Sequence, residues 1–195
     1  MNILIDVLPE YVEIDGIEYK INTDFRIGIM FELLIQDNTL TDMEKVEIAL
    51  NLYYPEIPHD PIQALEKILW FYRCGKEYDA ESPQEGTEGT TQQQAIYSFE
   101  HDAEYIYAAF LDQYGIDLQD IEHLHWWKFR ALFKGLKEDN LIVKIMGYRA
   151  IKIDDSMTDS EKKFYRRMKK IYALPDNRTQ EEKERDFTNA IASLF

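Results

Sequence analysis

Two Glu-x-x-His sequences are the candidates for metal chemistry in this chain of 195 residues. Glu122 and His125 are three residues apart, so on the helix expected here they would share one face, as in di-iron helical bundles. Such a site also needs a second Glu-x-x-His and further carboxylates from other helices. The other copy, Glu56 to His59, contains Pro58 and lies in a stretch that is not expected to be helical. We therefore expect no metal ion and no cofactor.

Nucleophilic and phosphate chemistry lack the motifs that they need. The sequence has no glycine loop that could cradle a phosphate and no nucleophile motif in its required context. The single cysteine, Cys74, lies in the aromatic run LWFYRCGK, where a small buried hydrophobic side chain is expected. Glu100, His101, Asp102 and Glu104 are expected to form a solvated face with an ion pair. We expect no catalytic residue and no enzymatic activity.

A basic run, KKFYRRMKK, is the clearest candidate for binding a negatively charged partner. On a helix its cations would lie opposite an apolar stripe, a face that suits phosphates or an acidic membrane surface. The isoelectric point of about 4.7 argues against nucleic acid, because most of the surface would repel a phosphate backbone. Pairing with acidic residues of the same or a neighbouring subunit and a merely solvated face both stay open. The cations are Lys162, Lys163, Arg166, Arg167, Lys169 and Lys170.

The net charge of −15 is unevenly distributed along the chain. Residues 1–120 carry 6 Lys and Arg against 25 Asp and Glu, whereas residues 121–195 carry 16 against 12. An acidic front and a mildly basic back could associate head to tail in a homo-oligomer. The alternative is that the charge only keeps the protein soluble.

Composition and the N-terminal sequence favour a folded protein inside the cell. Hydrophobic residues make up 45% of the chain and aromatic residues 13%, which excludes a wholly disordered protein. One cysteine fits a reducing compartment. The N-terminal MNILIDVLPE has no basic region and is interrupted by Asp6 and Pro9, so it does not resemble a signal peptide. No stretch approaches the ~20 apolar residues of a membrane span.

The most aromatic stretch, residues 97–136, predicts two central helices. Phe99, Ala103, Ile106 and Phe110 recur at helical spacing, and Gly115 is a favourable stop for the first helix. The second helix is expected from about residue 124 and is apolar over much of its circumference. The core candidates are Tyr97, Phe99, Ile106, Phe110, Trp126, Trp127, Phe129 and Phe133.

Turn and capping residues predict the elements on either side of the two central helices. Asp15-Gly16 lies between two alternating runs and predicts a β-hairpin. Gly28 weakens the first helix, and the close approach of another helix is its expected purpose. The predicted fold is mostly α, a multi-helix orthogonal bundle with one small N-terminal β-hairpin. The predicted helix starts are Thr23 or Asp24, Thr41 with Glu44, Asp60 with Pro61, and Thr158 with Glu161.

Two segments are expected to stand apart from the bundle. Residues 76–95 contain no Leu, Ile, Val, Met or Phe and predict a flexible insert within one helical domain, residues 1–178. Residues 179–195 predict a C-terminal amphipathic helix. Its apolar stripe is Phe187, Ile191, Leu194 and Phe195.

Several long segments, most of them rich in aromatic residues, resemble those of a known family. They are YIYAAFLDQYGIDL, IEHLHWWKFRALFKGL, KIMGYRAI and FYRRMKKIYALPD, with VEIDGIEYKINTDFR, LNLYYPEIP and LWFYRCGK nearer the N-terminus. In these segments the chain resembles the phage Gp15 family of small tail-region proteins from phages and prophages of Gram-positive bacteria. The resemblance covers nearly the whole chain except the insert and the C-terminal end. It implies a tail assembly chaperone that acts in the cytoplasm of the bacterial host cell and binds the tape measure protein.

Three functions follow as hypotheses. The first is a non-enzymatic chaperone that coats the tape measure protein and is released as tail tube subunits polymerise. Its expected client surface is the stripe at residues 187–195, because an apolar run at a chain end has little of its own fold to cover it; docking on its own core is the alternative. The second is a structural minor tail component, and the third an acidic decoy that mimics nucleic acid. The expected partners are the tape measure protein, and as candidates the tail tube protein and further copies of the chain; we expect no nucleic acid and no membrane.

Overall fold

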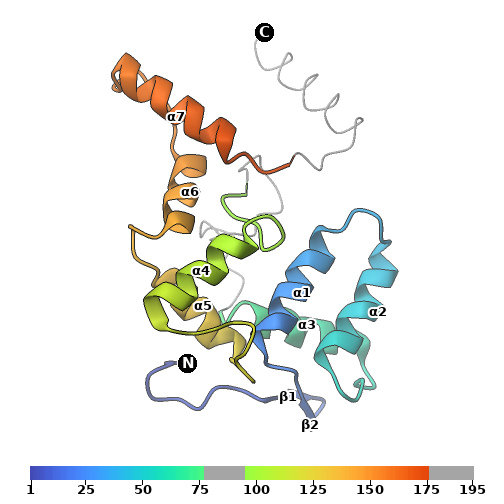
Figure 1. The fold of residues 1–195 in the computed structure, drawn as a ribbon. Coiled ribbons are helices and arrows are strands. Elements are labelled where there is room, and N and C mark those ends of the chain that lie inside the picture. Colours follow the sequence, from blue (N-terminus) through green and yellow to red (C-terminus); the bar gives the residue numbers. More distant parts are fainter. Residues whose placement is uncertain (77–94, 176–195) are drawn as a thin grey trace.

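The computed structural model describes residues 1–76 and 95–175. The predicted C-terminal helix, and all but the two end residues of the predicted insert, lie outside these residues. The described residues form seven helices and one two-stranded antiparallel hairpin, which confirms the mostly α fold (Figure 1). The elements are β1 (Tyr11–Ile14), β2 (Ile17–Lys20), α1 (Phe25–Gln36), α2 (Asp42–Tyr53), α3 (Pro61–Tyr72), α4 (Ala103–Tyr114), α5 (Trp126–Lys134), α6 (Leu141–Ala150) and α7 (Asp159–Ile171).

The N-terminal hairpin turns at the predicted dipeptide. Asp15 and Gly16 both have positive φ, 51° and 77°, as the mirror-image two-residue turn requires. The register pairs Ile14 with Ile17 and Val12 with Tyr19. Val12 and Ile14 point into the core and are buried, so one face of the hairpin is covered by the helical part of the molecule.

Local capping fixes the helix starts much as predicted. Asp24, rather than Thr23, caps α1 by accepting a hydrogen bond from Arg26 N at 3.0 Å. Capping boxes begin α2 at Thr41 and α7 at Thr158. Asp60 caps α3 ahead of Pro61, whose missing N–H is not needed in the first turn. These starts were predictable because every partner lies within three residues.

Helix α4 begins later than the periodicity predicts. Phe99 is buried, but residues 98–102 form a turn in which Asp102 N donates to Ser98 O at 2.9 Å. The Asp102 carboxylate accepts a hydrogen bond from Ser98 N, also at 2.9 Å. The helix ends as expected at Gly115, which has a φ of 66°.

The start of α5 also corrects the prediction. Phe25 N donates to Leu124 O at 2.8 Å, and Trp126 N donates to Thr23 O at 2.7 Å, so residues 124–125 are extended beside the start of α1. The helix begins only at Trp126, with His125 as its cap. Glu122 and His125 therefore do not share a helical face, and the spacing argument for a metal site fails.

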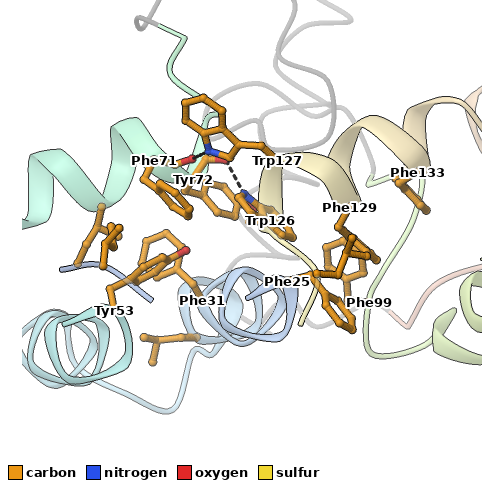
Figure 2. Close-up of a cluster of buried hydrophobic side chains, with 14 of the residues drawn as sticks. Phe25, Phe31, Tyr53, Phe71, Tyr72, Phe99, Trp126, Trp127, Phe129 and Phe133 are labelled. Atoms are coloured by element: carbon orange, nitrogen blue, oxygen red, sulfur yellow. Dashed lines mark hydrogen bonds between the residues drawn. The ribbon is translucent and has the colours of Figure 1, made fainter. Parts of the chain in front are cut away.

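The core is an aromatic cluster centred on α5 (Figure 2). Phe129 stacks on Phe110 at a ring distance of 4.9 Å and on Phe25 at 5.1 Å. The indole N–H of Trp126 donates to Tyr72 O at 2.9 Å, and that of Trp127 to Phe71 O at 2.7 Å. Both indoles thus donate to backbone carbonyls in the last turn of α3, where Phe71 O also accepts from Cys74 N at 2.9 Å. All eight core candidates are buried.

Gly28 allows an aromatic ring to lie against α1. A Cβ placed at Gly28 would lie 2.3 Å from Cε3 and 2.4 Å from Cδ2 of Trp126. The close approach is therefore made by a side chain of α5 and not by the backbone of another helix.

Helix α6 packs on α4 and α7 packs on α6; in Figure 1 both stand above α4, whereas α1–α3 lie to its right. Ile142 and Ile145 are buried on the inner face of α6. Helix α7 packs on α6 and has no buried residue of its own. This helix carries the basic run.

Candidate partner-binding surface

The apolar stripe of α7 is largely open to solvent. Phe164 exposes 46% and Ile171 55% of its surface. Tyr148 of α6 lies against this helix, with ring distances of 6.0 Å to Phe164, in an edge contact, and 6.0 Å to Tyr172, stacked. The result is an aromatic surface formed by α6 and α7, which we call the α7 surface: Tyr148, Phe164, Met168 and Ile171.

Four of the six cations on α7 are exposed. Lys162 donates to Asp155 Oδ1 at 3.2 Å and Lys169 to Arg149 O at 2.7 Å, and both are half-buried. The remaining cations make no hydrogen bond or ion pair with any residue that the structure describes. They are Lys163, Arg166, Arg167 and Lys170. The structure thus places the predicted basic residues beside an open apolar stripe.

Arg149 holds the α7 surface to the rest of the fold. Its guanidinium donates to both carboxylate oxygens of Asp102, at 2.6 and 2.9 Å, and the side chains are only 9% and 2% exposed. It also donates to Ile96 O at 3.0 Å and to Tyr172 O, just beyond α7, at 2.6 Å. One side chain therefore joins α6, the segment before α4 and the C-terminal end of α7. Asp102 is buried, which corrects its expected place on a solvated face.

Arg149 was not predicted from the sequence as a functional or structural residue. It follows Ile142 and Ile145 at helical spacing, so it continues the buried stripe of α6. A charged residue at such a position signals a buried partner, because an unpaired buried charge is costly.

The candidate chemical residues do not converge. His125 Nε2 lies 3.2 Å from Pro9 O, to which it donates, and Nδ1 accepts from Trp127 N at 3.1 Å. Both ring nitrogens are occupied, and burial lowers the His125 pKa, which favours the neutral ring. Burial raises the pKa of the Cys74 thiol, which opposes nucleophilic reactivity. Among residues 1–76 and 95–175 there is no group of three His, Cys, Asp or Glu that could hold a metal ion.

One buried carboxylate was not singled out from the sequence. Glu32 is 2% exposed and accepts a hydrogen bond of 2.5 Å from the Tyr72 hydroxyl. Burial raises its pKa more than the Tyr72 hydrogen bond and the nearby Arg130 lower it. Its spacing of seven from Phe25 places it on the buried face of α1, which is the signal that could have revealed it.

The Glu32 pKa gives a pH prediction. Since the folded protein binds this proton more tightly than the unfolded chain, Glu32 favours folding most at low pH. That contribution is lost as the pH rises from the ordinary glutamate value of about 4.3 through the raised folded value. We expect the unfolding free energy of wild type minus that of Glu32→Gln to fall across this interval, measured by urea denaturation at a series of pH values. The control is Glu47→Gln, which changes an exposed glutamate, with its unfolding free energy compared with that of wild type in the same way. If the two differences changed equally with pH, the raised pKa of Glu32 would be contradicted.

The predicted stripe Phe187, Ile191, Leu194 and Phe195 lies outside the described residues. Within the described part of the chain, no helix is long and apolar enough to cross a membrane. Of the predicted partner-binding residues, the structure describes the six cations of α7, four of them exposed beside the open apolar stripe.

The chain matched no curated protein and no solved structure. Residues 4–174 match the family model described as Bacteriophage Gp15 protein, a range that includes α7 and ends before the predicted C-terminal stripe. This match spans most of the chain, and the protein is therefore a member of the Bacteriophage Gp15 family.

Proposed function

We propose that this phage protein is a non-enzymatic tail assembly chaperone that binds the tape measure protein in the host cytoplasm. The α7 surface is the observation that carries this proposal. A 13-residue helix with no buried residue, an open apolar stripe and flanking cations suits an amphipathic client helix with an acidic border. Apolar contact would supply affinity, and the cations would favour clients with acids beside the stripe.

Co-expression with the tape measure protein of the same gene cluster tests the proposal. We expect the tape measure protein to become soluble and to co-purify with the wild-type chain. Phe164→Asp with Ile171→Asp should abolish both effects, because each carboxylate would be buried unpaired against an apolar client. The matched control is Ile62→Asp, which changes a 73% exposed residue at the start of α3 and should leave both effects intact.

Two further variants separate the candidate surfaces. Arg166→Glu with Arg167→Glu should weaken co-purification if the client is acidic, and the loss should be smaller at high salt. Truncation after residue 178 tests the stripe at residues 187–195 on its own. If the wild-type chain neither solubilises nor retains the tape measure protein, the chaperone proposal fails. Detection of the chain in purified virions would then support a structural tail component.

A further inference from the structure

The first seven residues present an apolar segment to solvent. Leu4, Ile5 and Val7 are 88, 80 and 92% exposed, and Ile3 is 44% exposed. A short turn organises this segment, with Asn2 N donating to Asp6 Oδ2 at 2.6 Å and Asp6 N to Asn2 O at 2.9 Å. We call residues 1–7 the arm. An exposed apolar segment of this kind is unusual at the surface of a protein that has no partner for it.

The outer edge of β1 offers free backbone groups. Ile14 with Ile17 and Val12 with Tyr19 are the hydrogen-bonded pairs of the hairpin, so the N–H and C=O groups of Tyr11 and Glu13 point away from β2. No described residue donates a backbone hydrogen bond to these groups or accepts one from them. A free edge of this kind can accept another strand.

A groove lies between this edge and α3. Its volume is about 340 Å³, and β2 contributes no lining residue. Tyr11 and Trp70 give it apolar walls, and its charged side chains are Glu13, Glu66 and Lys67. The lining residues are Tyr11, Val12, Glu13, Glu66, Lys67 and Trp70.

The arm cannot occupy the groove of its own molecule. Pro9 O accepts a hydrogen bond from His125, and Glu10 O accepts one from Ile21 N at 2.9 Å, so the chain is fixed immediately before β1. From this anchor the arm runs away from the hairpin and from α3 (Figure 1). With only residues 8–10 between arm and strand, the chain cannot reverse to lie beside β1.

We propose that the arm of one copy opens its Asn2–Asp6 turn and adds as a strand to the β1 edge of a second copy. Ile3, Ile5 and Val7 alternate and are β-branched, a pattern suited to an added strand with one face in an apolar groove. Asp6, the only charged side chain of the arm, can pair with Lys67, but Glu13 and Glu66 of the groove carry its own sign, so the affinity must come from the strand hydrogen bonds and the apolar side chains. The arm and the groove are different surfaces, so the contact is head to tail and leaves one free arm and one free groove at the ends.

This contact is independent of the α7 surface and of the proposed client. A single added strand makes a small interface, in the class below about 1,200 Å² where association is weak and concentration-dependent. We therefore expect short open chains of copies that grow with protein concentration.

Mixing two complementary variants tests the proposal. Ile3→Asp with Ile5→Asp disables the arm, and Glu13→Pro removes the outward N–H of β1 while keeping the hydrogen bonds to β2. In sedimentation velocity at up to about 1 mM, the weak end of specific affinities, wild type should form a concentration-dependent series. Each variant alone should stay monomeric. An equimolar mixture should form heterodimers and nothing longer.

The register of the hairpin supplies a matched control. Glu18 lies opposite Glu13, and its N–H also points outward, but from the edge of β2. Glu18→Pro should therefore assemble as wild type does. If circular dichroism shows that Glu13→Pro disturbs the fold, Lys67→Glu takes its place and should lower the association constant, with recovery when it is mixed with Asp6→Lys. A monomeric wild type, a mixture that stays monomeric, or equal loss in both proline variants would overturn the proposal.

Discussion

Replacing Arg149 by methionine is expected to lower the free energy of unfolding by about 3–5 kcal/mol, the cost of leaving a buried charge without its partner. Asp102 would keep only the hydrogen bond from Ser98 N. The Ile96 and Tyr172 carbonyls would lose a donor as well. Since domains of this size are stable by only about 5–15 kcal/mol, such a loss would be a large fraction of the total. Equilibrium urea denaturation measures it.

Two further variants show whether the stability lost in Arg149→Met comes from the charge of Arg149 or from the shape of its guanidinium group. Arg149→Lys keeps the charge but cannot bridge both carboxylate oxygens in the same plane, so an intermediate loss is expected. Adding Asp102→Asn to Arg149→Met removes the orphaned charge and should recover part of the stability. A loss below about 1 kcal/mol in Arg149→Met, the range of exposed ion pairs, would show that the pair is not buried in solution.

Gly28→Ala is expected to destabilise the protein by about 1–3 kcal/mol, the usual range for overpacking a core. The added methyl group would overlap the Trp126 ring, which cannot move without weakening its hydrogen bond to Tyr72 O. On an open helix the same change would instead stabilise by roughly 1 kcal/mol, because alanine favours helix more than glycine does.

Gly147→Ala is the matched control for that change. Gly147 lies within α6, and a Cβ there would meet nothing within 4 Å. We expect this variant to be as stable as wild type or slightly more stable, by the same urea measurement. If both variants lowered the free energy of unfolding, or both raised it, the contact between Gly28 and Trp126 would not explain the effect of Gly28→Ala.

The sequence predicted the elements whose determinants are local. The hairpin depends on Asp15-Gly16, and the capping box of α2 depends on Thr41 and Glu44, so each is complete within four residues. The start of α4 depends instead on Asp102, whose partner Arg149 is 47 residues away. The start of α5 depends on backbone pairing with residues 23–25, about which periodicity carries no information.

The candidate surface was predicted only in part, because only some of its determinants are local in the sequence. The composition of the basic run reveals an amphipathic helix, and the capping box at Thr158 fixes where it starts. That its apolar stripe stays open depends on what packs beside it, and this is a property of the tertiary structure. The groove beside β1 was not predicted, because it is formed by residues of β1 and α3 that are far apart in the sequence.

The position of the three tryptophans decides what intrinsic fluorescence can report. Trp126 and Trp127 bind carbonyls at the end of α3, and Trp70 of α3 lies 5.6 Å from the Trp127 ring. All three tryptophans thus lie where α3 meets α5, and α7 contains no tryptophan. Tryptophan emission should therefore follow the loss of the contact between α3 and α5, whereas unfolding of α7 alone should leave the emission unchanged and lower only the helical ellipticity. Two optical probes applied to one sample can therefore resolve whether this protein unfolds in one step or releases its basic helix first.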